Sequence, residues 1–122
     1  MAGLTTAESQ ATLDARFPTS GATDYVAYST NGSSEFGGLA RTAVGATNWA
    51  AATSADPSVK DNTAGITSAA ASSGGTVTHF AIFSASSGGT QRTDWTALSS
   101  SRTVATGDTL TWAAGALQVT LT

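Results

Sequence analysis

The chain has 122 residues, of which only 11% are charged, and its formal net charge at pH 7 is −3. Its five basic residues are scattered, which argues against a nucleic-acid partner, and the lack of cysteine excludes disulfides and thiolate metal sites. No apolar run approaches the roughly 18 residues of a membrane span, and the first residues do not have the pattern of a signal peptide. We therefore expect a soluble protein that is made in the cytoplasm.

Alanine, serine and threonine make up about half of the chain, which departs from the usual composition of globular proteins. This composition lowers the content of large hydrophobic residues without the high net charge of a disordered segment. We expect one domain over residues 1–122, with an N-terminal helix or arm at 1–20 and strands at 21–122. Its neutral, hydroxyl-rich surface would pack closely against copies of itself or other proteins, because little charge has to be desolvated.

The first predicted element is a short helix from Thr5 to Phe17. Thr5 and Glu8 have the spacing of a capping box, in which the hydroxyl and the carboxylate each bind a free backbone amide of the first turn. The apolar stripe of this helix is weak, so we expect the helix to dock at an edge of the fold. Leu4, Thr5 and Glu8 are the candidate residues of an N-terminal docking arm.

Short strands separated by turn signals fill the middle of the chain. Asn31-Gly32 predicts a turn, because both residues tolerate positive φ. A second turn is predicted at 86–89, which ends in the glycine pair at 88–89. The segment 76–84 carries apolar residues on both faces, which predicts a central strand covered on both sides. The expected strands in this part are 24–30, 39–44, 49–53, 59–62, 76–84 and 91–99.

Residues 103–122 hold the clearest alternation in the chain. Leu117, Val119 and Leu121 alternate with polar residues, which is the pattern of a strand with one face on a core. Residues 109–112 alternate in the same way, and Gly115 in the link between the two runs allows a tight turn or bulge. A turn signal at 106–108 precedes them, after Val104. We expect two or three adjacent strands here, at the centre of the domain.

The spacing of the turn signals predicts the fold class. They recur about every 8–12 residues between short strands, as in all-β sandwiches and related barrels. The expected fold is therefore all-β, an antiparallel β-sandwich of jelly-roll-like type with a short N-terminal helix.

Reactive chemistry has little support in the sequence. His79 is the only histidine, so a hydrolytic triad would need His79 to meet a serine and a carboxylate such as Asp94, and no nucleophile-elbow pattern is present. A structural histidine is the favoured interpretation. One histidine and scattered carboxylates do not supply a zinc site or the facing carboxylates of a glycosidase. We expect no catalytic residues, no metal, no cofactor and no enzymatic activity.

The aromatic residues are better candidates for a recognition surface. Trp112 follows the alternation of the tail, which favours a core position, whereas Trp49 and Trp95 have polar neighbours. Exposed tryptophan rings stack on sugar rings, and their amphipathic character suits a wet interface. Trp49, Trp95 and Arg92 are therefore the candidate residues for binding carbohydrate, and simple packing of the two rings is the alternative.

Four stretches of the chain resemble a known family. They are MAGLTTAESQATLDARF at 1–17, NGSSEFGGLAR at 31–41, GTVTHFAIFSASSGGT at 75–90 and LSSSRTVATGDTLTWAAGALQVTLT at 98–122. In this order they resemble small virion proteins of tailed bacteriophages, usually labelled phage tail fibre or minor tail proteins. The closing stretch is the most specific, and the chain departs from the family at 50–72, where Ala/Ser-rich sequence replaces larger aliphatic residues.

The resemblance implies a non-enzymatic structural protein on the exterior of a virion, made in the host cytoplasm, with no catalytic residues to carry over. Its implied partners are other virion proteins, either tail or major capsid protein, and further copies of itself. Two alternatives stay open. One is a capsid decoration protein, because small β-sandwich proteins also coat capsids, and the other is a carbohydrate-binding module for host-surface glycan.

Overall fold

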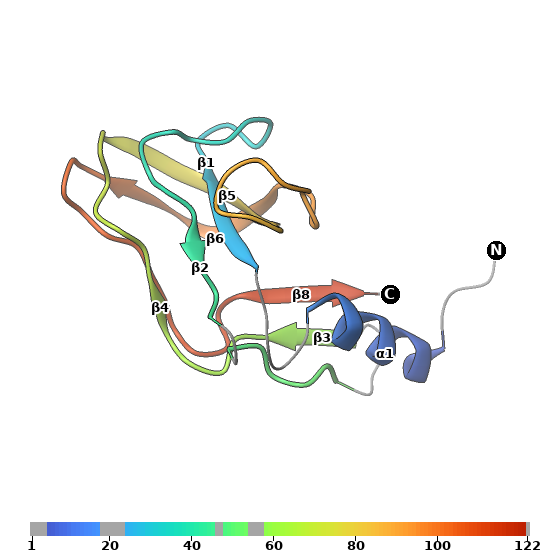
Figure 1. The fold of residues 1–122 in the computed structure, drawn as a ribbon. Helices are drawn as coiled ribbons and strands as arrows, with labels where there is room; N and C mark the ends of the chain where they lie inside the picture. Colours follow the sequence, from blue (N-terminus) through green and yellow to red (C-terminus); the bar gives the residue numbers. More distant parts are fainter. Residues whose placement is uncertain (1–4, 18–23, 46–47, 54–57, 122) are drawn as a thin grey trace. The chain divides into compact units, whose positions relative to one another are not determined.

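The computed structural model describes residues 5–17, 24–45, 48–53 and 58–121. Within these residues the chain forms one helix and eight strands, drawn in Figure 1. Their bounds are α1 Thr6–Arg16, β1 Tyr25–Ser29, β2 Thr42–Ala43, β3 Ser58–Asp61, β4 Ile66–Thr67, β5 Gly75–Phe83, β6 Thr96–Val104, β7 Thr111–Trp112 and β8 Gln118–Leu121. The described pairings of β1, β3 and β5 are antiparallel, and the expected all-β fold with a short N-terminal helix is confirmed.

Two compact units make up the chain. The helix unit comprises residues 1–22, 44–65 and 112–122 and holds α1, β3 and β8. The sheet unit comprises residues 23–43 and 66–111 and holds β1, β2, β4, β5 and β6. The expectation of one domain over 1–122 stays a prediction.

A four-stranded sheet with the order β2-β1-β5-β6 is the main element of the sheet unit. β1 pairs with β5 along its whole length, and Val26, Ala27 and Tyr28 of β1 are all 0% exposed. The buried hydroxyl of Tyr28 shares a hydrogen bond of 2.6 Å with the hydroxyl of Thr42, which satisfies a polar group inside the core. The prediction of a central strand at 76–84 is confirmed, since β5 lies between β1 and β6.

The strand β6 is shifted along the chain and is irregular. The strand expected at 91–99 runs instead from Thr96 to Val104. Opposite β5, Val77 pairs with Arg102 and His79 pairs with Ala97, so residues 98–101 lie opposite the single residue Thr78. Such a bulge interrupts the outer edge of a sheet and makes it a poorer template for pairing with another strand.

The chain before β5 and the chain after β6 also pair with each other, as a two-stranded ribbon that includes β4 and β7. Ala71 N donates to Asp108 O, and Ser68 N donates to Leu110 O, at 2.8 and 2.7 Å. The turn predicted at 106–108 is confirmed by Gly107, whose φ is 93°. The Ala/Ser-rich run after Ile66 is therefore held by its backbone hydrogen bonds, although few of its side chains are large enough to fill a core.

In the helix unit, β3 and β8 form a two-stranded antiparallel sheet. Leu117 and Val119 are buried and Gln118 between them is exposed, which confirms the alternation predicted for the end of the tail. The predicted turn at Gly115 is also confirmed, because its φ of 78° is one that glycine adopts without strain.

Residues 49–53 lie along the other edge of β3 without forming the regular strand expected there. Ala50 N donates to Asp61 O and Thr53 N donates to Val59 O, each at 2.8 Å. Trp49 forms an isolated bridge with Asn62. The strand expected at 39–44 is likewise shorter, and its regular part is β2.

The helix α1 begins where the sequence predicts. Thr5 is its N-cap, and the Thr5 hydroxyl accepts a hydrogen bond from Glu8 N at 3.2 Å. Leu13 and Phe17 are each 4% exposed, and the Phe17 ring meets the Trp49 ring edge-on with centroids 5.4 Å apart. These contacts dock the helix although its apolar stripe is narrow.

The tail does not form the centre of the fold, and this prediction was wrong. β7 pairs with β4, and β8 pairs with β3, so the tail strands are not neighbours of each other. The centre of the larger sheet is formed by β1 and β5, which carry apolar residues on both faces. Alternation predicts which face of a strand is buried, but it does not predict which strand lies beside it.

Candidate recognition site

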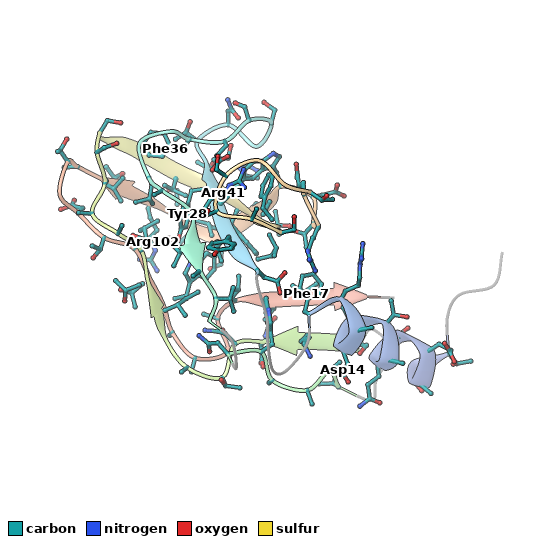
Figure 2. All side chains as sticks on the ribbon, in the orientation of Figure 1. Asp14, Phe17, Tyr28, Phe36, Arg41 and Arg102 are labelled. Carbon is teal, nitrogen blue, oxygen red and sulfur yellow. The ribbon has the colours of Figure 1, made fainter. Side chains whose placement is uncertain are left out.

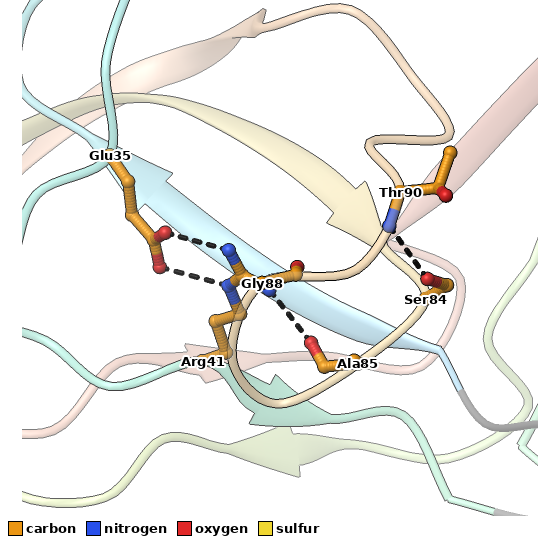
Figure 3. A network of polar contacts seen from close by, with 6 residues as sticks. All are labelled: Glu35, Arg41, Ser84, Ala85, Gly88 and Thr90. Carbon is orange, nitrogen blue, oxygen red and sulfur yellow. Dashed lines mark hydrogen bonds and ion pairs between the residues drawn. The ribbon is translucent and has the colours of Figure 1, made fainter.

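Arg41 lies at the middle of a polar network in the sheet unit (Figure 3). Its guanidinium makes a bidentate ion pair with Glu35, with Nε–Oε2 and Nη2–Oε1 distances of 3.0 and 2.8 Å. Its Nη1 donates at 2.8 Å to the backbone carbonyls of both Ala85 and Gly88. The Arg41 side chain is only 7% exposed, so these partners and not bulk water stabilise its charge.

The two carbonyls belong to residues 84–90, which we call the braced loop and which follow β5. The loop is closed on itself, because Thr90 N donates to Ser84 Oγ at 2.8 Å and Ser84 N donates to Thr90 O at 3.0 Å. Gly88 and Gly89 have φ of 64° and 71°, and the turn predicted at 86–89 is confirmed. The exposed residues of the loop are Ser86, Ser87, Gly88, Gly89 and Thr90.

An aromatic pair lies on the other side of Arg41. The guanidinium carbon is 3.9 Å from the centroid of the Phe83 ring, a cation–π contact. Phe83 in turn contacts Trp95, with centroids 5.9 Å apart and planes tilted by 53°. Phe83 and Trp95 are both half-buried, so Trp95 keeps part of its surface accessible.

Arg92 is held by a second ion pair in the same unit. Its Nη1 is 3.3 Å from Oδ1 of Asp24, and the two side chains are 22% and 1% exposed. Arg92 N donates to Ile82 O at 2.7 Å, which anchors the chain just after the braced loop. The charge of Arg92 is therefore matched by a buried carboxylate.

The three residues predicted for the recognition surface belong to different units of the chain. Trp95 and Arg92 both belong to the sheet unit, whereas Trp49 is 1% exposed and lies in the core of the helix unit. A ring buried to this extent offers no face to a sugar, and Trp49 leaves the candidate surface. Its polar neighbour Asn48 was misleading, because the Asn48 side chain serves the backbone by accepting from Ala64 N at 2.9 Å.

The candidate docking arm is only partly described. Leu4 lies outside the described residues. Thr5 and Glu8 are exposed: the Thr5 hydroxyl caps the helix, and Glu8 is the acidic residue of its first turn. Their role as a docking arm stays a prediction.

The environment of His79 fits the structural interpretation. Its Nδ1 is 2.7 Å from the hydroxyl of Thr78. The ring lies against Gly32, where an added Cβ atom would come within 2.9 Å of it. Among the described residues, no group of three or more His, Cys, Asp or Glu side chains could hold a metal ion. Nor does the described part of the chain contain a helix long and apolar enough to cross a membrane.

A buried lysine gives the helix unit its main electrostatic feature. Lys60 on β3 is 0% exposed, and its Nζ is 2.7 Å from Oδ1 of Asp14 on α1. Partial burial raises the pKa of Asp14, but the hydrogen bonds from Lys60 and from Ala52 N, with the charge of Lys60, outweigh it. The net effect is a pKa of Asp14 below its ordinary value.

Arg41 and Glu35 were not predicted from the sequence. Arg41 pairs with Glu35 and contacts Phe83, and Phe83 contacts the predicted residue Trp95. Arg41 and Glu35 stand in a stretch without regular structure, and a spacing of six residues there says nothing about contact. The available signal was chemical: an arginine and a glutamate in a chain with so few charges are candidates for pairing.

No curated protein matches this chain. The sequence model of one protein family, described as "Podophage GP4 fiber I protein gp80", matches residues 4–120. This match spans nearly the whole chain, includes both units and agrees with the resemblance carried by the four stretches. The chain therefore belongs to this family of phage tail fibre proteins.

Proposed function

We propose that this phage fibre protein is a non-enzymatic structural subunit on the outside of the virion, of the minor tail or tail fibre type. It is made in the host cytoplasm and then built into the particle. The observation that carries the proposal is the family match over residues 4–120. The hydroxyl-rich, weakly charged chain supports it, because such surfaces need little desolvation when they meet another protein.

The strand β6 illustrates the kind of surface that is available for packing. Seven of its nine residues are exposed, all but Leu98 and Val104, and most of them are Ser, Thr or Ala. Arg102 is its only charged residue (labelled in Figure 2). We infer that other virion proteins and further copies of this chain are the partners of such surfaces.

Purified particles provide the test. We expect mass spectrometry to detect the chain in virions after density-gradient purification and a high-salt wash, because a structural subunit stays attached to the particle. Quantitative gels should show a band far weaker than that of the major capsid protein. Immunogold labelling should mark the tail.

The same experiment distinguishes a tail fibre protein from the alternative, a capsid decoration protein. A band comparable in molar amount to the major capsid protein, with label over the capsid, would establish decoration and reject the fibre placement. A chain that is absent from washed particles would reject both versions.

A further inference from the structure

We propose that the braced loop (residues 84–90) and Trp95 form a binding site for neutral carbohydrate. The inference deepens the proposed function. It rests on that function in one respect, that the site is exposed on the outside of the virion. Its basis is the combination of an ordered hydroxyl-bearing loop, a half-exposed indole and arginine charges that are already paired.

The braced loop is an exposed hairpin loop at the end of the main sheet. Phe83 forms an isolated antiparallel bridge with Gln91, and Ser84 N donates to Thr90 O at 3.0 Å, so residues 85–89 lie between the paired ends. Exposed loops that a rigid sheet holds in position are commonly sites of recognition. The braced loop adds little to the core, since most of its residues are exposed.

Arg41 ties this exposed loop to the rest of the sheet unit. Its side chain is 7% exposed, yet two of its hydrogen bonds go to the loop carbonyls of Ala85 and Gly88, each at 2.8 Å. Glu35 holds the guanidinium in place from the opposite side, as Figure 3 shows. A loop that is already ordered binds a ligand with a smaller entropic cost.

The exposed groups define the chemical class of the ligand. Residues 84–91 carry no charge, and Ser86, Ser87 and Thr90 expose hydroxyl groups, which both donate and accept hydrogen bonds. A sugar presents the same groups in return. Trp95 is half-buried and carries the aromatic ring against which the C–H groups of a pyranose would pack.

The charges at the site disfavour an anionic glycan. Arg41 is paired with Glu35, and Arg92 is paired with Asp24, so both guanidinium charges are already matched. Asp94, which precedes Trp95, is exposed and repels a sulfate or carboxylate. A neutral oligosaccharide meets none of these penalties.

The test is direct binding of the full chain to a defined set of sugars. The probes are maltose, cellobiose, lactose and N-acetyllactosamine, compared with sialyllactose and sulfated lactose, measured by calorimetry and on an array. We expect at least one neutral probe to bind with a Kd of about 1 mM or tighter, a range typical of weak specific sites. Binding confined to the acidic probes, or no binding to any, overturns the inference.

Two pairs of variants locate the site. Trp95→Ala should weaken binding of the neutral probe by about tenfold or more, whereas Trp112→Ala, which also removes a half-buried indole, should leave it within about twofold. Ser87→Glu, which places a charge at the tip of the braced loop, should also weaken binding of the neutral probe by about tenfold or more. Its control is Ser99→Glu on β6, which should leave binding within about twofold. Unchanged binding in both Trp95→Ala and Ser87→Glu overturns the inference.

Failure here is distinguishable from failure of the proposed function. A chain that is present in washed virions but binds no neutral sugar keeps its structural role and loses the carbohydrate site. A chain that binds sugar through Trp95 but is absent from virions keeps the site and loses the fibre role.

Discussion

Arg41 orders a segment that has no hydrophobic core of its own. It joins Glu35, two loop carbonyls and the Phe83 ring. Charge-assisted hydrogen bonds of a buried guanidinium are stronger than neutral ones, and removing the donor leaves its acceptors without partners. In a chain with few charges, one arginine therefore has a large local effect.

Replacing Arg41 by methionine should destabilise the protein by about 2 kcal/mol, because the Ala85 and Gly88 carbonyls and the Glu35 carboxylate lose their donor. Arg102→Met is the matched control, since Arg102 is exposed on β6 and should change stability by less than about 0.5 kcal/mol. Urea unfolding measures both variants. Equal stability of the two would show that the Arg41 network contributes little.

The Asp14–Lys60 pair should make the stability of the helix unit depend on acid pH. The pKa of Asp14 is lowered in the folded protein from its ordinary value of 3.8, so its contribution is fully present above that value. The contribution is lost as the pH falls through the lowered, folded-state pKa. We expect part of the loss of stability below pH 3.8 to disappear in Asp14→Asn.

Comparison of urea midpoints between neutral pH and pH 3 for the parent and Asp14→Asn measures this effect. Glu8→Gln is the control. Glu8 is an exposed carboxylate of the same helix, and the ion pair described for Lys60 is with Asp14. An acid response in Asp14→Asn identical to that of the parent would contradict the prediction.

At the scale of elements, specific residues fix the conformation of the braced loop as they fix the strands. The braced loop depends on two consecutive glycines with positive φ and on hydrogen bonds between Ser84 and Thr90. At Gly89 an added Cβ atom would also come within 2.7 Å of the Ser84 hydroxyl. Glycine at this position is therefore required both by the backbone conformation and by the lack of space.

Gly89→Ala should destabilise the protein by about 1–2 kcal/mol, because alanine is strained at a φ of 71° and would push Ser84 away from Thr90. Gly37→Ala is the control, since an added Cβ there meets nothing within 4 Å. Thermal unfolding of the two variants gives the comparison. A Tm for Gly89→Ala at or above that of Gly37→Ala would contradict this account of the loop.

For the whole molecule, stability is expected to be uneven. The two central strands of the larger sheet carry completely buried residues, among them Val26, Ala27, Val77 and Ile82. By contrast, the bulged part of β6 at 98–101 is exposed or half-buried and pairs irregularly. Local opening therefore takes less free energy at 98–101 than in β1 or β5.

Hydrogen exchange monitored by NMR should show this difference. We expect the slowest amides in β1 and at 79–83 of β5, because their exchange requires the sheet to unfold, and fast exchange at 98–101. Exchange at 98–101 as slow as in β1, measured on the isolated chain, would contradict this prediction. Protection that appears at 98–101 only in assembled particles would indicate that a partner covers β6.

Local signals in the sequence were sufficient for several elements. The Thr5 cap, the strands at 24–30 and 76–84, and the turns at 86–89 and 106–108 are confirmed, because each depends on residues close together in the chain. The strand at 91–99 was misplaced, because the residues after the braced loop hydrogen-bond to β5 without joining β6. Its Trp95 looked like a strand residue, and tertiary contact with Phe83 decided its position instead.

The amino-acid sequence alone determined the all-β class, the helix start, the turns and, through the four matching stretches, the fibre family. Only the tertiary structure decided which strands are neighbours, that Trp49 is buried while Trp95 is half-exposed, and that Arg41 braces residues 84–90. Caps and turns result from interactions within a few residues. Pairing, burial and ion pairs depend on segments tens of residues apart, and the spacing of residue types along a chain does not record which of those segments meet.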